Sequence, residues 1–197
     1  MTTGPDDISK VVLDAARAAY ARRGYLNTTV KGVAAAAGVA PDVVRRYYAN
    51  REALFAAAMR LPVDPATSIA QLLAPGIDGL GERLVRVTLR MLDDPETRDQ
   101  LAAMVRDGAG ASKATASLRE FLESAVVDRV ASALRVPDAR MRVTLATSYL
   151  VGVAASRYVL RLEPLASATE DEIVLLVAPA VQAALTGPAP ASGARRE

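Results

Sequence analysis

Apolar residues along most of the chain recur every three or four positions, which is the spacing of one face of an α-helix. Near the N-terminus such a stripe runs from Ile8 to Tyr20, and Gly24 follows it as a stop signal. Asp6 or Asp7 is expected to cap this helix, because a carboxylate there accepts hydrogen bonds from the unpaired backbone N–H groups of the first turn. No stretch alternates apolar and polar residues between turn signals, so we expect an all-α protein.

Three shorter helices are expected to follow within the first 61 residues. Polar caps, a proline and a glycine mark their ends, as is typical of helix termini. Their expected ranges are Val30–Ala37 between Thr28 or Thr29 and Gly38, then Pro41–Tyr47, then a helix capped by Asn50 that ends near Leu61.

Proline and glycine are concentrated between residues 62 and 81, where we expect a link and an irregular first piece of a larger body. Helices are expected beyond it at residues 81–92, Pro95–Arg106, 113–134, 138–162 and 170–185. The last eleven residues are rich in Pro, Gly, Ala and Ser and are expected to be disordered. The chain is thus divided into a head (1–60), a body (61–186) and a tail (187–197).

The junction of the second and third helices has the residue types that a helix-turn-helix requires. Ala34 is small where two helices cross, Gly38 can take a positive φ in the turn, and Val44 can face back into the core. The remaining core of the head is expected to consist of Val33, Ala37, Val39 and Tyr48 together with Val12, Ala16, Tyr20 and Leu54.

Charge and composition narrow the function classes. Residues 1–60 carry nine Lys/Arg against five Asp/Glu, whereas the whole chain has a net charge of only +2. A basic head fits contact with phosphates, although solvated helix faces can be equally basic.

Histidine, cysteine and tryptophan are absent, which removes the usual zinc ligands, the thiolate nucleophile and the histidine base. We therefore expect no enzyme, no cofactor and no metal. The cysteine-free chain and its polar, acidic first ten residues predict a cytoplasmic protein. Prolines and a glycine interrupt the longest uncharged stretch, 173–194, so no membrane span is expected.

Residues 12–54, VLDAARAAYARRGYLNTTVKGVAAAAGVAPDVVRRYYANREAL, resemble the N-terminal signature of TetR-family regulators in order, spacing and helix punctuation. The remainder resembles, more loosely, the ligand-binding bodies of actinobacterial members, most closely in RYVLRLEPLAS at 157–167. The resemblance implies a three-helix helix-turn-helix head that binds DNA, on a larger helical body for effector binding and dimerisation.

Two positions depart from the family pattern. Ala40 stands where the family usually places Ser or Thr ahead of the recognition helix, so a side-chain cap is lost there. Arg45 stands where the family often has tyrosine. Both positions bear on which operator is read rather than on the mode of binding.

The resemblance implies that the helix opened by Pro41 lies in the major groove with its first residues towards base edges. Arg45 and Arg46 are the expected base or phosphate contacts, because a guanidinium pairs bidentately with guanine O6 and N7. Solvated surface arginines are the alternative. Asp42 either reads cytosine N4 or complements the helix dipole, and we favour the dipole.

Phosphate contacts are expected at Thr29, Tyr47 and Arg51, which offer hydroxyls and a helix start, with Lys31 as a weaker candidate. The alternative for Tyr47 is core packing, a role that suits the neighbouring Tyr48 better.

Small residues on helix 138–162 favour close approach of a second copy. They are Ser148, Gly152, Ala155 and Ser156. The last helix offers a wide apolar face that includes Ile173, Val177, Ala180, Val181 and Ala184. We expect a homodimer with a four-helix interface; packing within one chain is the alternative.

An effector pocket is expected among the middle helices. Its candidate lining is Leu101, Met104, Val105, Phe121, Leu122, Tyr149, Leu150 and Tyr158, each of which can equally be core. Arg157 lies in an otherwise apolar helix, where it either pairs with Glu163 or Glu123 or meets an acidic effector.

The expected function is a repressor that binds a palindromic double-stranded operator as a homodimer and is released by an apolar or amphipathic small molecule. Two other functional classes compete with this one. An enzyme would need convergent acid and base groups, whereas the carboxylates here are scattered. A helical protein-interaction module would lack DNA affinity.

Overall fold

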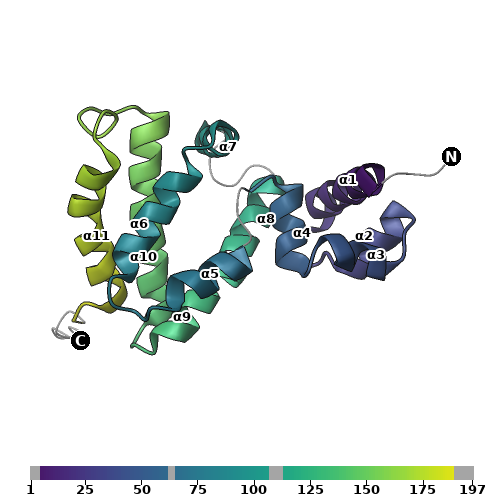
Figure 1. Cartoon of the computed structure of the whole chain (residues 1–197), viewed down its shortest axis with the longest axis horizontal. Helices are drawn as coiled ribbons and strands as arrows, with labels where there is room; N and C mark the ends of the chain where they lie inside the picture. Colours follow the sequence, from purple (N-terminus) through teal and green to yellow (C-terminus); the bar gives the residue numbers. More distant parts are fainter. Residues whose placement is uncertain (1–4, 62–64, 107–112, 189–197) are drawn as a thin grey trace, which may run out of the picture. The chain divides into compact units, whose positions relative to one another are not determined.

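The computed structural model describes residues 5–61, 65–106 and 113–188 (Figure 1). All regular elements in these ranges are helical, which confirms the all-α prediction. Along the chain they are α1 (Pro5–Arg23), α2 (Val30–Ala37), α3 (Pro41–Tyr47), α4 (Arg51–Ala58), α5 (Pro65–Leu73), α6 (Leu80–Met91), α7 (Pro95–Arg106), α8 (Lys113–Phe121), η1 (Leu122–Val127), α9 (Asp128–Leu134), α10 (Ala139–Ala154), η2 (Ala155–Val159) and α11 (Glu170–Thr186). Both η segments are π-helical.

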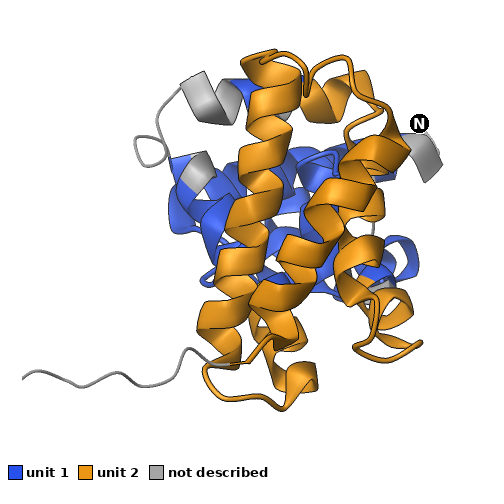
Figure 2. Ribbon diagram, turned by 90° about the vertical axis from the view of Figure 1, so that its left-hand side faces the viewer, with its two compact units in different colours: residues 1–68, 99–126 blue, residues 69–98, 127–197 orange. Residues whose placement is uncertain are grey.

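The chain forms two compact units, coloured separately in Figure 2. Unit 1 consists of residues 1–68 and 99–126, and unit 2 consists of residues 69–98 and 127–197. This division differs from a cut after residue 60, because residues 99–126 group with the N-terminal helices. The functional division into head and body stays a prediction, and residues 189–197 of the tail lie outside the described part.

The helix ends of the N-terminal region follow the predicted caps. The Thr29 hydroxyl accepts the backbone N–H of Gly32 at the start of α2 (3.1 Å), and the Asn50 side chain accepts that of Ala53 at the start of α4 (2.7 Å). Gly38 closes α2 with a φ of 69°, a left-handed conformation that glycine adopts without steric cost. The sequence signals at these ends are therefore confirmed.

Three predicted boundaries are wrong. Asp6 and Asp7 lie inside α1, which begins at Pro5, so neither is its cap. Helix α4 ends at Ala58 rather than near residue 61, since Arg60 has a φ of 54°. Residues 65–73, expected to be irregular, form α5: Pro65 opens this helix, and a proline is tolerated in a first turn, where its missing N–H costs no bond.

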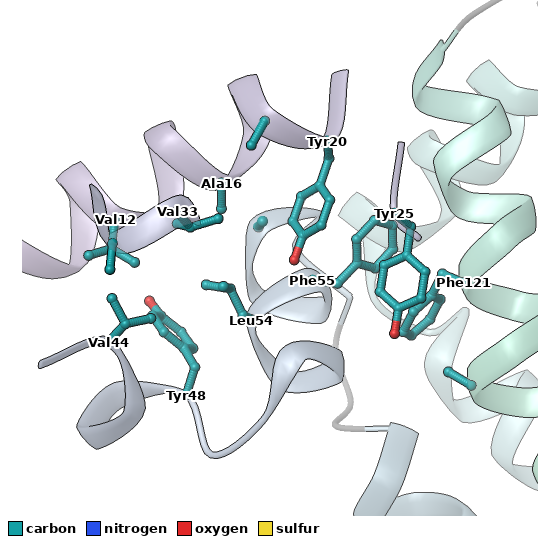
Figure 3. Packing of buried hydrophobic residues seen from close by; sticks show 14 residues of the cluster. Val12, Ala16, Tyr20, Tyr25, Val33, Val44, Tyr48, Leu54, Phe55 and Phe121 are labelled. Atoms are coloured by element: carbon teal, nitrogen blue, oxygen red, sulfur yellow. The ribbon is translucent and has the colours of Figure 1, made fainter. Parts of the chain in front are cut away.

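A single hydrophobic cluster holds unit 1 together (Figure 3). All predicted core positions belong to it, either buried or, for Ala37 and Val39, partly buried against it. The cluster also contains Tyr25, Phe55 and Phe121, which the sequence analysis did not place there. Phe55 and Phe121 stack with ring centroids 4.5 Å apart, so α8 contributes to the core that the N-terminal helices share.

In unit 2, α11 packs against both α6 and α10, and the long helices run side by side in Figure 2. The contact with α6 is close at Gly81, whose backbone N–H donates to the Gln182 side chain (2.8 Å). Helix α10 ends at Ala154 and continues as η2 to Val159, three residues short of the predicted end. The buried apolar residues of these helices are Leu80, Val85, Leu89, Val143, Ala146, Ala154, Ile173, Val174, Ala178, Val181 and Leu185.

Candidate nucleic-acid interface and body surfaces

The turn between α2 and α3 has the geometry of a helix-turn-helix. The backbone N–H of Gly38 donates to the Ala35 carbonyl (3.2 Å), and that of Val39 donates to the Ala34 carbonyl (3.0 Å). Ala34 on α2 and Val44 on α3 are fully buried, as the crossing of the two helices requires. This packing fixes which face of α3 points away from the core.

The outward face of α3 carries the charged residues predicted to contact DNA. Asp42, Arg45 and Arg46 are exposed, and Pro41 is partly buried at the first position of the helix. The Arg45 guanidinium lies 2.8 Å from the Asp42 carboxylate. This pair was not predicted, although three-residue spacing of opposite charges on a helix is the signal for it.

Ala40 precedes α3 with extended backbone angles (φ −68°, ψ 144°) and makes no side-chain cap, as its methyl side chain predicts. The start of α3 has Pro41 at its first position and a backbone hydrogen bond from Val43 N–H to the Ala40 carbonyl (3.0 Å).

The two neighbouring tyrosines at the end of α3 have different environments. Tyr47 is exposed, so its hydroxyl is available to a ligand. Tyr48 belongs to the core, and its hydroxyl lies 2.9 Å from the Ser9 hydroxyl. The structure confirms the prediction that Tyr48, and not Tyr47, packs inside.

The other predicted phosphate contacts begin α2 and α4. Thr29 and Lys31 are exposed; the Thr29 oxygen caps α2, which leaves its hydroxyl proton free to donate. Arg51 is about one-third exposed, and its guanidinium carbon lies 4.3 Å from the centre of the Tyr25 ring. Cation–π contact therefore orients this arginine.

Tyr25 connects Arg51 to the aromatic cluster. Its ring contacts Phe55 and Phe121 edge-on, at 5.0 and 5.3 Å, and its hydroxyl donates to the Glu52 carboxylate at 3.2 Å. Burial raises the pKa of Tyr25 above its ordinary value, and the negative charge of Glu52 acts in the same direction. The tyrosine stays neutral at physiological pH and serves as a platform for the arginine.

The predicted effector-pocket residues are distributed over both units. Phe121 and Leu122 pack in the unit 1 cluster, whereas Tyr149, Leu150, Arg157 and Tyr158 belong to unit 2. Tyr149 is about half exposed on α10. The side chains of Leu101, Met104 and Val105 lie outside the described part of α7.

Arg157 takes partners that the sequence did not suggest. Its Nη1 donates to the carbonyls of Leu165 (2.6 Å) and Ala168 (2.7 Å) rather than to Glu163 or Glu123. These bonds hold the turn that leads from η2 into α11. Two guanidinium groups lie near the Tyr158 ring: the carbon of Arg157 is 5.3 Å and that of Arg98 is 6.0 Å from its centre.

Of the predicted dimer residues, Ile173 and Val181 are buried within unit 2. Their side chains already pack inside the chain, so we remove them from the interface. Ser148, Gly152 and Ala180 are exposed, and a Cβ on Gly152 would have no neighbour within 4 Å. Partly buried are Ala155, Ser156, Val177 and Ala184.

Large apolar side chains that were not among the predicted dimer residues lie on the outward sides of α10 and α11. Met141, Leu145 and Tyr149 follow one another at four-residue spacing on α10, and all are about half exposed or more. Leu175 and Leu176 on α11 are exposed by 73% and 77%. We call these five residues, with Ser148, Gly152 and Ala180, the α10–α11 face.

A groove of about 510 Å³ lies between α6 and α11, lined by Gly79, Glu82, Arg86, Asp171, Val174, Leu175, Ala178, Pro179 and Gln182. Arg86 donates to Glu82 one turn earlier on α6 (3.0 Å), and to Asp171 (3.1 Å) and Glu170 (3.2 Å) at the start of α11. These carboxylates raise the pKa of the Arg86 guanidinium, Glu82 most strongly. The bonds from Arg86 to Glu170 and Asp171 therefore connect α6 to the start of α11.

Within the described residues, no helix is both long and apolar enough to cross a membrane, and no cluster of acidic side chains could hold a metal ion.

Comparison with known proteins gives matches over both parts of the chain. The family model for bacterial regulatory proteins of the tetR family matches residues 12–58, and the model for the tetracyclin repressor-like C-terminal domain matches residues 78–185. No curated protein sequence matches the chain.

Among solved structures, a TetR-family regulator from Streptomyces coelicolor A3 is 33% identical; the alignment covers 94% of this chain and 98% of that chain, with a TM-score of 0.53. The fatty acid degradation regulator FadR from Bacillus halodurans is 18% identical, with 91% and 99% covered and a TM-score of 0.48. NalD, the secondary repressor of the MexAB-OprM multidrug efflux pump in Pseudomonas aeruginosa, is 15% identical, with 91% and 96% covered and a TM-score of 0.45.

The helix-turn-helix geometry, the two family models and the Streptomyces relative agree with one another and with the expected actinobacterial type. The chain belongs to the TetR family of DNA-binding bacterial transcription regulators.

Proposed function

We propose that this regulator binds a palindromic double-stranded operator as a homodimer, represses transcription there, and is released by a small apolar or amphipathic effector. The observation that carries the proposal is the orientation of α3: Val44 is buried in the head, while Arg45 and Arg46 point outward. A helix held in this way can enter the major groove with its charged face towards the bases.

Within the groove, Arg45 and Arg46 are the base-reading candidates, and Pro41 places the start of α3 near base edges. Thr29, Lys31, Tyr47 and Arg51 are proposed to contact phosphates. Arg51 is supported by its stacking on Tyr25. Because the guanidinium is already held in few conformations, it loses less conformational entropy when it binds a phosphate.

The homodimer is proposed to form through the α10–α11 face. Exposed leucines and a methionine on adjacent helices are unusual on a monomer surface and typical of an interface. Gly152 and Ser148 lie within the face and would permit two copies of α10 to approach closely. Packing of α10 and α11 on their symmetry mates would bury both helices in a four-helix interface.

The effector is proposed to bind among the helices of the body, and the lining named from the sequence stays a prediction. By linkage, the effector must prefer the state that does not bind DNA, and DNA must weaken effector binding by the same factor. Two recognition helices can enter successive major grooves only when they are about 34–36 Å apart. A small change in their separation would therefore be enough to release the protein from the operator. We propose no catalytic step, and we propose that the protein acts in the cytoplasm.

A mobility-shift assay with random duplex DNA at low salt tests the proposed binding directly. We expect a shift that weakens steeply as salt is raised, because phosphate contacts release counterions. Absence of any shift at low salt would contradict the proposal and favour a protein-interaction module. The effector step fails separately if small molecules that raise the melting temperature leave DNA affinity unchanged.

A further inference from the structure

The turn between α1 and α2 depends on a residue that lies almost a hundred positions later in the chain. The backbone N–H of Leu26 donates to Oε2 of Glu120, on α8, at 3.0 Å. Both residues belong to unit 1, so this bond lies within one compact body. The rest of the turn is closed locally, for example by the Thr28 hydroxyl, which donates to the Gly24 carbonyl at 2.7 Å.

Gly24 gives a second, independent sign that the turn is fitted to Glu120. A Cβ at this position would lie 2.9 Å from Oε2 and 3.2 Å from Oε1 of Glu120, so the carboxylate occupies the space of a side chain. Gly24 also has a φ of 79°, which favours glycine on its own account. The missing side chain therefore serves both the turn and the approach of the carboxylate.

Residues on either side of Glu120 fix α8 against the same region. The buried Ser117 hydroxyl donates to the Tyr20 carbonyl, at the last turns of α1, at 3.0 Å. Phe121 is buried, and its ring contacts both Phe55 (4.5 Å) and Tyr25 (5.3 Å) in the cluster drawn in Figure 3. Because both neighbours are held, the carboxylate of Glu120 has a defined place and acts as a fixed acceptor.

The turn that Glu120 holds leads directly into the proposed phosphate contacts. Leu26 is three residues before Thr29, which caps α2, and Tyr25 carries Arg51 on its ring. A turn that moves would displace the start of α2 and the platform beneath Arg51 together. Binding of DNA would then have to restore the order of the turn, at a cost in affinity.

We propose that Glu120 is a positioning residue of the DNA-binding site: by accepting the Leu26 amide, it sets the place of the α1–α2 turn and of α2. The inference rests on the proposed function, because Thr29 and Arg51 must contact DNA for the position of the turn to matter. It makes α8, which lies far from the helix-turn-helix in sequence, part of the DNA-binding unit.

The test compares Glu120→Gln with Glu120→Met in the full-length protein. Both variants lose the charge and keep the length of the side chain, but only glutamine retains an oxygen acceptor. The probe is the duplex that the wild-type protein selects from a random pool. We expect the Gln variant to bind it at least as tightly as the wild type, and the Met variant to bind about two- to tenfold more weakly than the Gln variant, the range of one net hydrogen bond.

Hydrogen exchange of the Leu26 amide is the second measurement. Exchange should be slow in the wild type and the Gln variant and faster in the Met variant, at a temperature where all three are folded. If the Met variant does not fold, Glu120→Ala, which adds no bulk, takes its place. A purely structural role would lower the melting temperature and leave operator affinity of the folded protein unchanged.

Equal affinity of the Gln and Met variants would overturn the proposal, whether both match the wild type or both are weak. If the wild-type protein selects no duplex, the proposed function fails and the positioning role fails with it. That outcome differs from a failure of the positioning role alone, in which the wild type still selects a sequence.

Discussion

Tyr20 and Tyr25 lie in the same aromatic cluster, but only one of their two hydroxyl groups is hydrogen-bonded. The Tyr25 hydroxyl donates to Glu52, whereas the buried Tyr20 hydroxyl has no hydrogen-bond partner among the described residues. An unpaired buried polar group costs about 1–3 kcal/mol. Tyr20→Phe should therefore leave the free energy of unfolding unchanged or raise it by about 1 kcal/mol, whereas Tyr25→Phe, the matched control, should lower it by about 1 kcal/mol. Urea denaturation at pH 7 measures both changes.

The pH dependence of the same variant gives an independent check. Burial raises the pKa of Tyr20 well above its ordinary value of 10.0, so above pH 10 the folded state keeps a proton that the unfolded state loses. Stability is then fully present below pH 10 and falls as the pH rises further. Tyr20→Phe should reduce this alkaline loss. An identical slope above pH 10 in the two proteins would show that Tyr20 does not titrate differently on unfolding.

Arg45 and Arg51 should affect DNA binding in different ways. If Arg45 reads a base, Arg45→Ala should cost about 1–3 kcal/mol and relax the preference at one position of each half-site. Arg51→Ala should weaken all sequences alike and flatten the salt dependence, since a phosphate contact carries no sequence information. Selection from random duplexes with each variant measures the two effects. Unchanged sequence preference in Arg45→Ala would argue against base reading.

At the scale of elements, two helical glycines of unit 2 have opposite surroundings. A Cβ on Gly81 would lie 2.6 Å from the Ala178 carbonyl oxygen and 2.7 Å from the Gln182 nitrogen, whereas on Gly152 it would meet nothing within 4 Å. Gly81→Ala should push α6 away from α11 and lower the free energy of unfolding by about 1–3 kcal/mol. Gly152→Ala should leave the fold of the chain intact. Thermal and urea unfolding measure both variants. If Gly81→Ala and Gly152→Ala lost equal stability, the close crossing of α6 and α11 at Gly81 would be contradicted.

Local signals were sufficient to predict the helix-turn-helix. Ala34, Gly38 and Val44 each have a residue type that the turn or the crossing demands, and neighbours within a few positions supply the caps. The missing cap at Ala40 followed from its methyl side chain alone. Helix α5 was missed because the proline and glycine residues around it outweighed its short apolar stretch.

Contacts between distant residues could not be predicted in the same way. Glu120 and Phe121 reach the turn at Leu26 across more than ninety positions, and no periodicity reports such pairing. Helix α11 is apolar nearly all round, so the sequence does not tell that Ile173 and Val181 face inward while Leu175 and Leu176 face outward. Burial of one face by α6 and α10 decides this, and only the fold shows it.

At the scale of the whole molecule, the α10–α11 face should determine the oligomeric state. Leu176→Glu places a charge on the outward side of α11 without disturbing the core, because this side chain is 77% exposed. Burying an unpaired charge is costly, so the variant should be monomeric and bind the operator more weakly. Leu162→Glu, an exposed leucine outside both helices, is the control. Sedimentation distinguishes them; a Leu176→Glu dimer of normal affinity would place the interface elsewhere.

The central claim is that two α3 helices of a homodimer read two half-sites of one operator. Selection of the wild-type protein's preferred sites from a random duplex pool, followed by sequencing, tests it most directly. We expect enrichment of a palindrome whose half-site centres are about one helical turn of DNA apart, or a multiple of it. Enrichment of no sequence at all, or of a single asymmetric site bound by a monomer, would contradict the account.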